Sequence, residues 1–222
     1  MKITLIKPSM GDIITGYNIN EGSMEPLQLA IIAGLINKPD IAVLYDDRLE
    51  KIPFDESTDL VCITVDTFNA RRAYQIAGEF KKRDVKVIMG GMHASLLPEE
   101  VANYADAVVI GDAEPVWSNL IEDFKAGQLK KIYKADFDIP QNGLFPDRSI
   151  FKGKKYLPVS MLQFSRGCKY NCSFCSVSRF FHHSHICRKV EDVIQEIEKD
   201  KLKTILFVDD NITQNKEALK QL

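Results

Sequence analysis

Short apolar runs alternate with longer amphipathic stretches over residues 1–135 of the chain. The short runs are rich in β-branched residues and do not alternate between polar and apolar positions, and they cover residues 3–6, 41–44, 60–65, 85–89 and 107–110. A strand that is covered on both faces of a sheet has no polar face. These runs therefore predict buried parallel strands.

Helical periodicity separates the predicted strands. In residues 70–83 the apolar side chains recur at i, i+3, i+4 and i+7, the spacing of one buried helix face, at Ala73, Ile76, Ala77 and Phe80. Residues 26–36 and 116–124 are two further predicted helices. Strand and helix thus alternate, which predicts an α/β fold with a doubly wound, Rossmann-like parallel sheet in residues 1–135. Ligands of such sheets bind beyond the carboxyl ends of the strands.

The alternation stops at residues 136–158, where prolines, glycines and Asn142 break any sustained period, so this stretch is predicted to be a linker. It resumes in residues 159–222. Here we expect a strand at 159–164, a cysteine-bearing loop, a helix, a second strand at 204–208 and the start of another helix. The chain is therefore predicted to contain one sheet domain, a linker and the first strand–helix units of a second domain.

Composition narrows the possible functions. The 222 residues carry 29 Lys+Arg against 31 Asp+Glu, a net charge of −2, whereas proteins that bind nucleic-acid backbones have strongly basic domains. No apolar run reaches the roughly 18 residues of a membrane span. Three of the 5 cysteines fall close together, unlike the spread pairs of a secreted disulfide framework. We therefore expect a cytoplasmic protein with a metal or redox site and no nucleic-acid partner.

The clustered cysteines are Cys168, Cys172 and Cys175, in the spacing Cys-x3-Cys-x2-Cys directly after a predicted strand. Thiolates are soft ligands that select iron–sulfur clusters or zinc. A 4Fe–4S cluster usually takes four cysteines, so three would leave one iron open to a substrate or cofactor. The alternative is a zinc site that adds Cys187 or one of His182, His183 and His185, although the usual signature of two Cys-x-x-Cys pairs, or of Cys pairs with spaced histidines, is absent. We expect Cys62 and Cys187 to be small core residues.

Together with the aromatic Phe174 before the third cysteine, this loop resembles the cluster motif of the radical S-adenosylmethionine (SAM) enzymes. The resemblance implies that Cys168, Cys172 and Cys175 hold a 4Fe–4S cluster and that Phe174 lies near the adenine of SAM. It implies an external one-electron reductant, whose electron cleaves SAM to a 5′-deoxyadenosyl radical. It also implies a (β/α) barrel, of which residues 159–222 form only the beginning, since a complete barrel needs roughly 200–250 residues.

Two carboxylates, Asp209 and Asp210, follow the second predicted strand of residues 159–222. At this place the radical SAM family usually carries a Gly-Gly-Glu-like segment that holds the SAM amino group. The present segment has no glycine, so the correspondence is one of position. Both carboxylates can accept charge-assisted hydrogen bonds from an ammonium group. The alternative is an ordinary turn and helix cap.

Residues 1–135 resemble the cobalamin-binding domain of the cobalamin-dependent radical SAM enzymes. The matching segments follow predicted strands and contain Gly90, Gly91 and His93, then Gly111 and Glu114. With the end of the third strand, the resemblance implies cobalamin contacts from Thr64, Asp66, Gly90, Gly91, His93, Gly111 and Glu114. Glycines permit a close approach of the backbone to a large ligand. We expect Gly91→Val to fill that approach path.

A cobalt-ligating histidine is not expected, because the chain lacks the Asp-x-His-x-x-Gly motif that supplies it in many cobalamin enzymes. His93 is alternatively a loop histidine without a cofactor role. The sequence thus predicts a cobalamin-dependent radical SAM enzyme or its N-terminal part, with methyl transfer to an unactivated carbon as the reaction that cobalamin would support. The alternative is a cobalamin-binding module without turnover. A reading frame that continues roughly 200 residues past Leu222 would favour the enzyme. The substrate, a small molecule or a peptide, is not identified.

Overall fold

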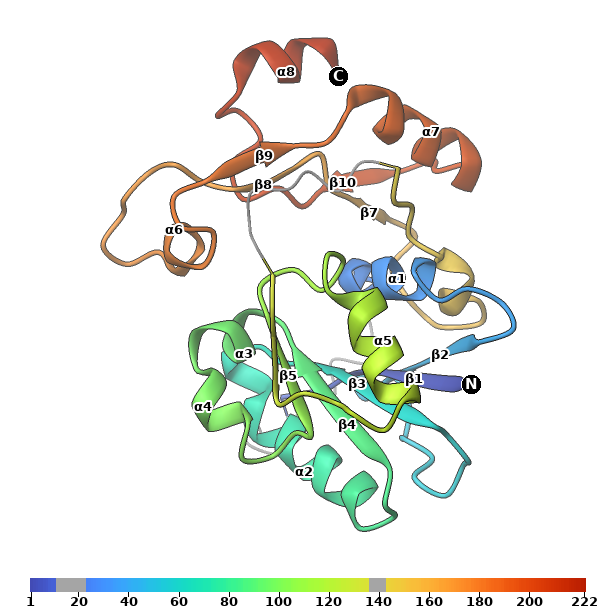
Figure 1. The fold of residues 1–222 in the computed structure, drawn as a ribbon. Coiled ribbons are helices and arrows are strands. Elements are labelled where there is room, and N and C mark those ends of the chain that lie inside the picture. Colours follow the sequence, from blue (N-terminus) through green and yellow to red (C-terminus); the bar gives the residue numbers. More distant parts are fainter. Residues whose placement is uncertain (11–22, 136–142) are drawn as a thin grey trace.

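A computed structural model describes residues 1–10, 23–135 and 143–222. Its largest element is a sheet of six parallel strands, drawn in the lower half of Figure 1. The strands are β1 (Lys2–Lys7), β2 (Ile41–Asp46), β3 (Leu60–Thr64), β4 (Lys86–Gly90), β5 (Ala107–Ile110) and β6 (Ile132–Lys134), in the order β2-β1-β3-β4-β5-β6. The doubly wound parallel sheet predicted from the sequence is confirmed. Strand β6 was not predicted, because only Tyr133 of its three residues is buried.

Helices cover both faces of this sheet, since successive strand residues point to opposite sides. Val61 and Ile63 of β3 belong to a core beneath α2 (Ala70–Lys81), whereas Leu60 and Cys62 belong to a core beneath α1 (Leu27–Gly34) and α5 (Trp117–Lys125). The remaining helices of this domain are α3 (Met92–Leu96), α4 (Pro98–Val101) and the 3₁₀ turn η1 (Thr67–Asn69). The four apolar residues of the predicted helix face in α2 are all buried, which confirms the i, i+3, i+4, i+7 reading.

Residues 143–158, the described part of the predicted linker, pack against the sheet domain. They contain the 3₁₀ turn η2 (Arg148–Phe151), and the Asp147 amide donates to the Ala30 carbonyl oxygen at 2.8 Å. Further along, the Tyr156 hydroxyl donates to Asp46 Oδ2 at 2.9 Å, and Asp46 is fully buried. The segment therefore follows the surface of the first domain closely.

Residues 159–222 form a smaller unit above the sheet domain (Figure 1). Strands β7 (Ser160–Leu162) and β10 (Ile205–Phe207) pair in parallel, and α7 (Val190–Asp200) lies between them in the chain, as predicted. The antiparallel pair β8 (Ser165–Gly167) and β9 (His185–Cys187) was not predicted, because its three-residue strands carry no apolar run. Helices α6 (Ser176–Phe180) and α8 (Lys216–Gln221) complete the unit. In the described part of the chain, no helix is long and apolar enough to cross a membrane.

Candidate functional site

A cavity of about 280 Å³ lies at the carboxyl ends of β3, β4 and β5, where the sheet domain meets the C-terminal unit. Neighbouring parallel strands end at the same edge of a sheet, so the loops after these three strands come together there. Five of the residues that the sequence pointed to line this cavity: Thr64, Gly90, Gly91, Gly111 and Glu114. We call it the cofactor cavity.

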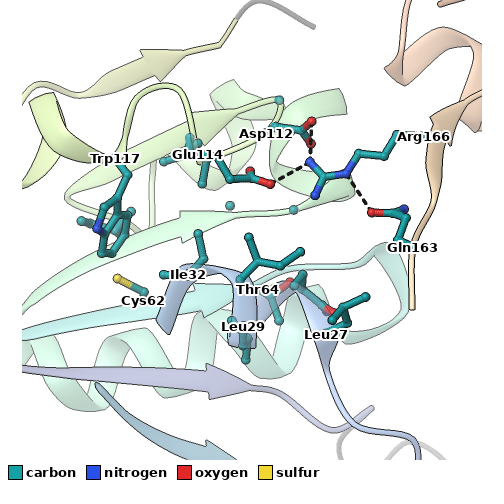
Figure 2. A pocket seen from close by; sticks show the side chains of 18 of the residues that line it. Leu27, Leu29, Ile32, Cys62, Thr64, Asp112, Glu114, Trp117, Gln163 and Arg166 are labelled. Atoms are coloured by element: carbon teal, nitrogen blue, oxygen red, sulfur yellow. Dashed lines mark hydrogen bonds and ion pairs between the residues drawn. The ribbon is translucent and has the colours of Figure 1, made fainter. Parts of the chain in front are cut away.

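The walls of the cofactor cavity are mostly apolar (Figure 2). Helix α1 contributes Leu27, Leu29 and Ile32, strand β3 contributes Cys62, and helix α5 contributes Trp117. Phe180, Phe181 and Val208 come from the C-terminal unit. An apolar cavity with a few polar groups at one place is typical of cofactor sites. Sequence reasoning missed the contributions of α1, Trp117 and α6, because these segments are far apart in the chain and carry no motif.

Two glycines in the cavity wall have backbone conformations that other residues rarely adopt. Gly91 has φ +104°, and a Cβ there would lie 2.9 Å from the Val65 carbonyl oxygen. The predicted effect of Gly91→Val therefore needs a different reason: the added side chain meets the backbone next to β3 before it reaches any ligand. Gly111 has φ +83°. Ser95 Oγ accepts from the Gly111 amide and donates to the Gly91 carbonyl oxygen, both at 2.9 Å, and so joins the two glycine loops.

Asp66 and His93 are not among the residues that line the cofactor cavity. Asp66 caps η1 and forms an ion pair with Lys7 Nζ at 2.6 Å. His93 lies on α3 rather than in a loop, and it is buried. Its Nδ1 is 3.2 Å from Thr67 Oγ1 and its Nε2 is 3.2 Å from the Tyr74 hydroxyl. Both ring nitrogens are thus engaged within the sheet domain, and the absence of a cobalt-ligating histidine stays a prediction. Cobalamin contacts by Asp66 and His93 stay predictions.

A largely buried cation, Arg166, stands at the polar end of the cofactor cavity (Figure 2). Arg166 Nη1 lies 2.8 Å from Asp112 Oδ2 and 2.7 Å from Glu114 Oε1, and its Nε donates to Gln163 Oε1 at 2.8 Å. Burial alone would lower the pKa of Arg166, but the charges of Glu114 and Asp112 raise it further than burial lowers it. The guanidinium therefore stays charged and links the loop after β5 to strand β8.

The three clustered cysteines lie on one loop, residues 168–175, which we call the cysteine loop. Cys172 is exposed, whereas Cys168 and Cys175 are half-buried. Asn211 Nδ2 donates to Cys168 Sγ at 3.5 Å, and the Phe174 side chain is almost fully exposed, at 91%. Three thiols on one accessible loop suit a cluster chemically. In the residues that the structure describes, however, no three Cys, His, Asp or Glu side chains are gathered closely enough to hold a metal.

The other two cysteines lie apart from this loop. Cys62 is buried in the sheet domain, as predicted, and burial raises the pKa of its thiol to about 12. Cys187 is half-buried against the small core of the C-terminal unit.

Asp209 and Asp210 hold the start of the cysteine loop. Asp209 accepts hydrogen bonds from the Phe164 amide at 3.2 Å, the Ser165 hydroxyl at 2.5 Å and the Ser165 amide. Asp210 Oδ2 accepts from the Gly167 amide at 2.8 Å, and burial raises the pKa of this carboxyl. Their interaction with SAM stays a prediction, and their observed partners are backbone amides and one hydroxyl of the segment before Cys168.

Comparison with known proteins connects the cofactor cavity to a family. Residues 21–121 match the family model described as "B12 binding domain". This range contains α1 and the loops after β3, β4 and β5, which form most of the cavity wall.

Three curated relatives are similar to this chain over part of their length. Bacteriochlorophyllide d C-8(2)-methyltransferase of Chlorobaculum tepidum is 34% identical over 72% of this chain and 38% of its own length. Bacteriochlorophyllide d C-12(1)-methyltransferase of the same organism is 31% identical over 90% of this chain and 47% of its own length. Anaerobic magnesium-protoporphyrin IX monomethyl ester cyclase of Rubrivivax gelatinosus is 29% identical over 61% of this chain and 29% of its own length. The chain thus spans half or less of each of these relatives.

Proposed function

The chain is a B12-binding-domain protein, and from this premise we propose that it binds cobalamin in the cofactor cavity and serves a radical SAM methyl transfer to an unactivated carbon. The observation that carries the proposal is the place of the cavity. Most of its lining residues belong to the family match, and it lies at the carboxyl ends of β3, β4 and β5, where ligands of doubly wound sheets bind.

The residues of the cavity suit a large, mainly apolar ring. Gly90, Gly91 and Gly111 keep one wall free of side chains, so a flat ligand can approach the backbone. Leu29, Ile32 and Trp117 supply apolar contact, and Phe180 and Phe181 cover the opposite side against water. His93 supports binding without a protein ligand to cobalt, since its two ring nitrogens are hydrogen-bonded to Thr67 and Tyr74.

The cysteine loop supplies the second part of the proposal. Cys168, Cys172 and Cys175 would hold a 4Fe–4S cluster, and an external one-electron reductant would serve it. When bound, cobalamin and a cluster with SAM supply the methyl group and the radical that reaction at an unactivated carbon requires, while the protein orients the partners and excludes water. The printed names of two relatives, both methyltransferases, support methyl transfer as the reaction class.

Trp117 offers a direct test of cobalamin binding. It is the single tryptophan of the chain, it is buried, and it lines the cofactor cavity. We expect cobalamin to quench its fluorescence with a dissociation constant in the micromolar range or below, which corresponds to a binding free energy of about −8 kcal/mol or more favourable. Ala113→Phe should raise the dissociation constant obtained from the quenching at least about tenfold, because Ala113 lines the cavity and the phenyl ring would occupy it.

Gly78→Ala is the matched control for a substitution in the sheet domain. Gly78 lies on α2, and a Cβ there meets nothing within 4 Å. This variant should bind cobalamin as the wild type does. If high micromolar cobalamin neither quenches Trp117 in the wild type nor comigrates with the chain on gel filtration, the cobalamin part of the proposal is wrong.

Reconstitution tests the cysteine loop separately. Anaerobic addition of iron and sulfide should give about four irons per chain. Alanine at Cys168, Cys172 or Cys175 should abolish the centre, whereas Cys187→Ala should retain it. Stoichiometric zinc in anaerobically purified protein, without iron uptake, would contradict the cluster.

A further inference from the structure

We propose that Arg166 is a positioning residue that fastens the cysteine loop to the cofactor cavity, so that occupancy of the cavity changes the accessibility of Cys168 and Cys175. This inference rests on the proposed function, because it takes cobalamin as the occupant. It starts from the contacts of β8, the strand that leads directly into the cysteine loop.

The two sides of β8 contact different parts of the molecule. The Ser165 and Gly167 amides donate to Asp209 and Asp210, which belong to the C-terminal unit. The side chain of the residue between them, Arg166, extends to Asp112 and Glu114 of the sheet domain. Because the backbone amides of this three-residue strand bind one part and the Arg166 side chain binds the other, β8 holds both parts at once. Cys168 follows this strand immediately, so its position depends on both attachments.

The attachment through Arg166 depends on the balance of charge between one cation and two carboxylates. One guanidinium lies between two carboxylates, and only 5% of the Glu114 side chain and 19% of the Arg166 side chain are exposed. Without Arg166, Asp112 and Glu114 would face each other in a mostly apolar cavity. Removing one partner of a buried charge pair leaves an uncompensated charge, which strongly favours a rearranged loop. The distance between the 111–114 loop and β8 is therefore closely defined while Arg166 is present.

A second contact joins the far end of the cysteine loop to the cavity wall. Ser176 Oγ, directly after Cys175, donates to Met92 Sδ at 3.4 Å, and Met92 follows Gly91. Both ends of the cysteine loop thus contact segments that follow cavity strands. A ligand in the cavity touches the 111–114 loop on one side and Phe180 and Phe181 on the other. It should therefore favour one arrangement of the cysteine loop, and by linkage the loop should affect ligand affinity equally.

The experiment measures alkylation of individual cysteines in the metal-free 222-residue chain. N-ethylmaleimide labelling is followed by mass spectrometry, with and without saturating cyanocobalamin. In the wild type, cobalamin should slow the labelling of Cys168 and Cys175 at least about fivefold, the lower end of usual coupling between sites. Arg166→Met should speed labelling of the free chain by a similar factor and should remove the effect of cobalamin at concentrations that still quench Trp117. Far-UV circular dichroism of each variant serves as the folding control, because Cys62 lines the cavity and bound cobalamin would itself change its labelling.

Two further variants keep the test decisive. Arg83→Met removes an arginine with exposed partners at the end of α2 and should behave as the wild type. The double variant Asp112→Asn, Glu114→Gln removes the two carboxylates instead of the cation. It should give the same labelling pattern as Arg166→Met, and it serves as the test in case Arg166→Met does not fold.

The outcomes separate the two proposals. If cobalamin binds and protects the cysteines equally in the wild type and in the Arg166 and carboxylate variants, it shields them directly and Arg166 does not position the loop. If cobalamin binds without protecting them in the wild type, the coupling alone is refuted. Absence of cobalamin binding to the wild type would refute the proposed function and the coupling with it.

Discussion

The sheet domain and the C-terminal unit differ in how completely they bury their strands. All five residues of β3 are buried between two helical layers. In β10, by contrast, Leu206 is 41% exposed and Phe207 is 37% exposed, and the unit has a small core around Leu162, Phe164 and Val193. Burial of apolar surface is the main driving force of folding. The difference indicates that the sheet domain is stable through its own core, whereas the C-terminal unit depends strongly on its contacts with that domain.

Those contacts include two arginines that form ion pairs across the junction. Arg148, between the two parts, forms ion pairs with Glu25 of the sheet domain and with Glu196 and Asp200 of α7. Arg166 makes the second link, to Asp112 and Glu114. An interface held by a few buried charges depends on geometry far more than an apolar core does. Three measurements test this difference between the two regions.

The largest effect should come from truncating the same residue type in the two regions. Leu60 of β3 is fully buried, so Leu60→Ala should lower the free energy of unfolding by about 2–5 kcal/mol. Leu206→Ala should cost less than about 1 kcal/mol, because the Leu206 side chain is already partly in water. Urea unfolding followed by Trp117 fluorescence measures the first loss, and far-UV circular dichroism measures the second. Equal losses would refute the contrast between the regions.

The second effect concerns the junction. Arg148→Met should cost about 3 kcal/mol, because Glu25 would remain largely buried without its cation and Glu196 would keep only Arg188. The loss should appear as a C-terminal transition in circular dichroism at lower urea than the Trp117 transition, which should move little. Arg83→Met, with exposed partners, is the control and should cost at most about 1 kcal/mol. A single shared transition in Arg148→Met would show that the two parts unfold together.

The smallest effect is a difference between the sheet domain and the junction in how their stability depends on pH. Burial would raise the pKa of Asp47, but hydrogen bonds from Arg72 and Ser9 lower it below 3.8. Its stabilisation is therefore present above the unfolded-state pKa and is lost as pH falls through the lower folded-state pKa. In Asp47→Asn, the free energy of unfolding measured by Trp117 fluorescence should fall less steeply as the pH decreases below about 4.

The junction should respond in the opposite direction. Burial raises the pKa of Glu25 above 4.5 despite the charge of Arg148. The contribution of Glu25 is therefore fully present below the unfolded-state pKa and is lost as pH rises through the higher folded-state pKa. In Glu25→Gln, the free energy of unfolding of the C-terminal unit should depend less on pH above about 4.5, and the pH dependence of the sheet domain should not change. The same slope change in both transitions would contradict this assignment.

Local sequence patterns were sufficient to predict the main strands and helices of the sheet domain, but not the short strands and the short helix α3. The buried strands and the apolar face of α2 follow from periodicity, because parallel strands and helices leave that signal in consecutive residues. Strands β6, β8 and β9 have three residues each and carry no such signal. The segment 90–94 looked like a loop, yet α3 begins at Met92 directly after the positive-φ Gly91.

Local sequence patterns predict the alternation of strand and helix, the sheet edge at which the loops after β3, β4 and β5 meet, and the spacing of the three cysteines. These features depend on neighbouring residues and on rules common to all parallel sheets. The tertiary structure alone decided that α1, Trp117 and Phe180 share one cavity, that His93 is engaged away from it, and that Arg166 pairs with Asp112 and Glu114. Arg166 is 54 positions from Asp112. Such contacts depend on how the two parts of the chain pack together, and no local pattern records that packing.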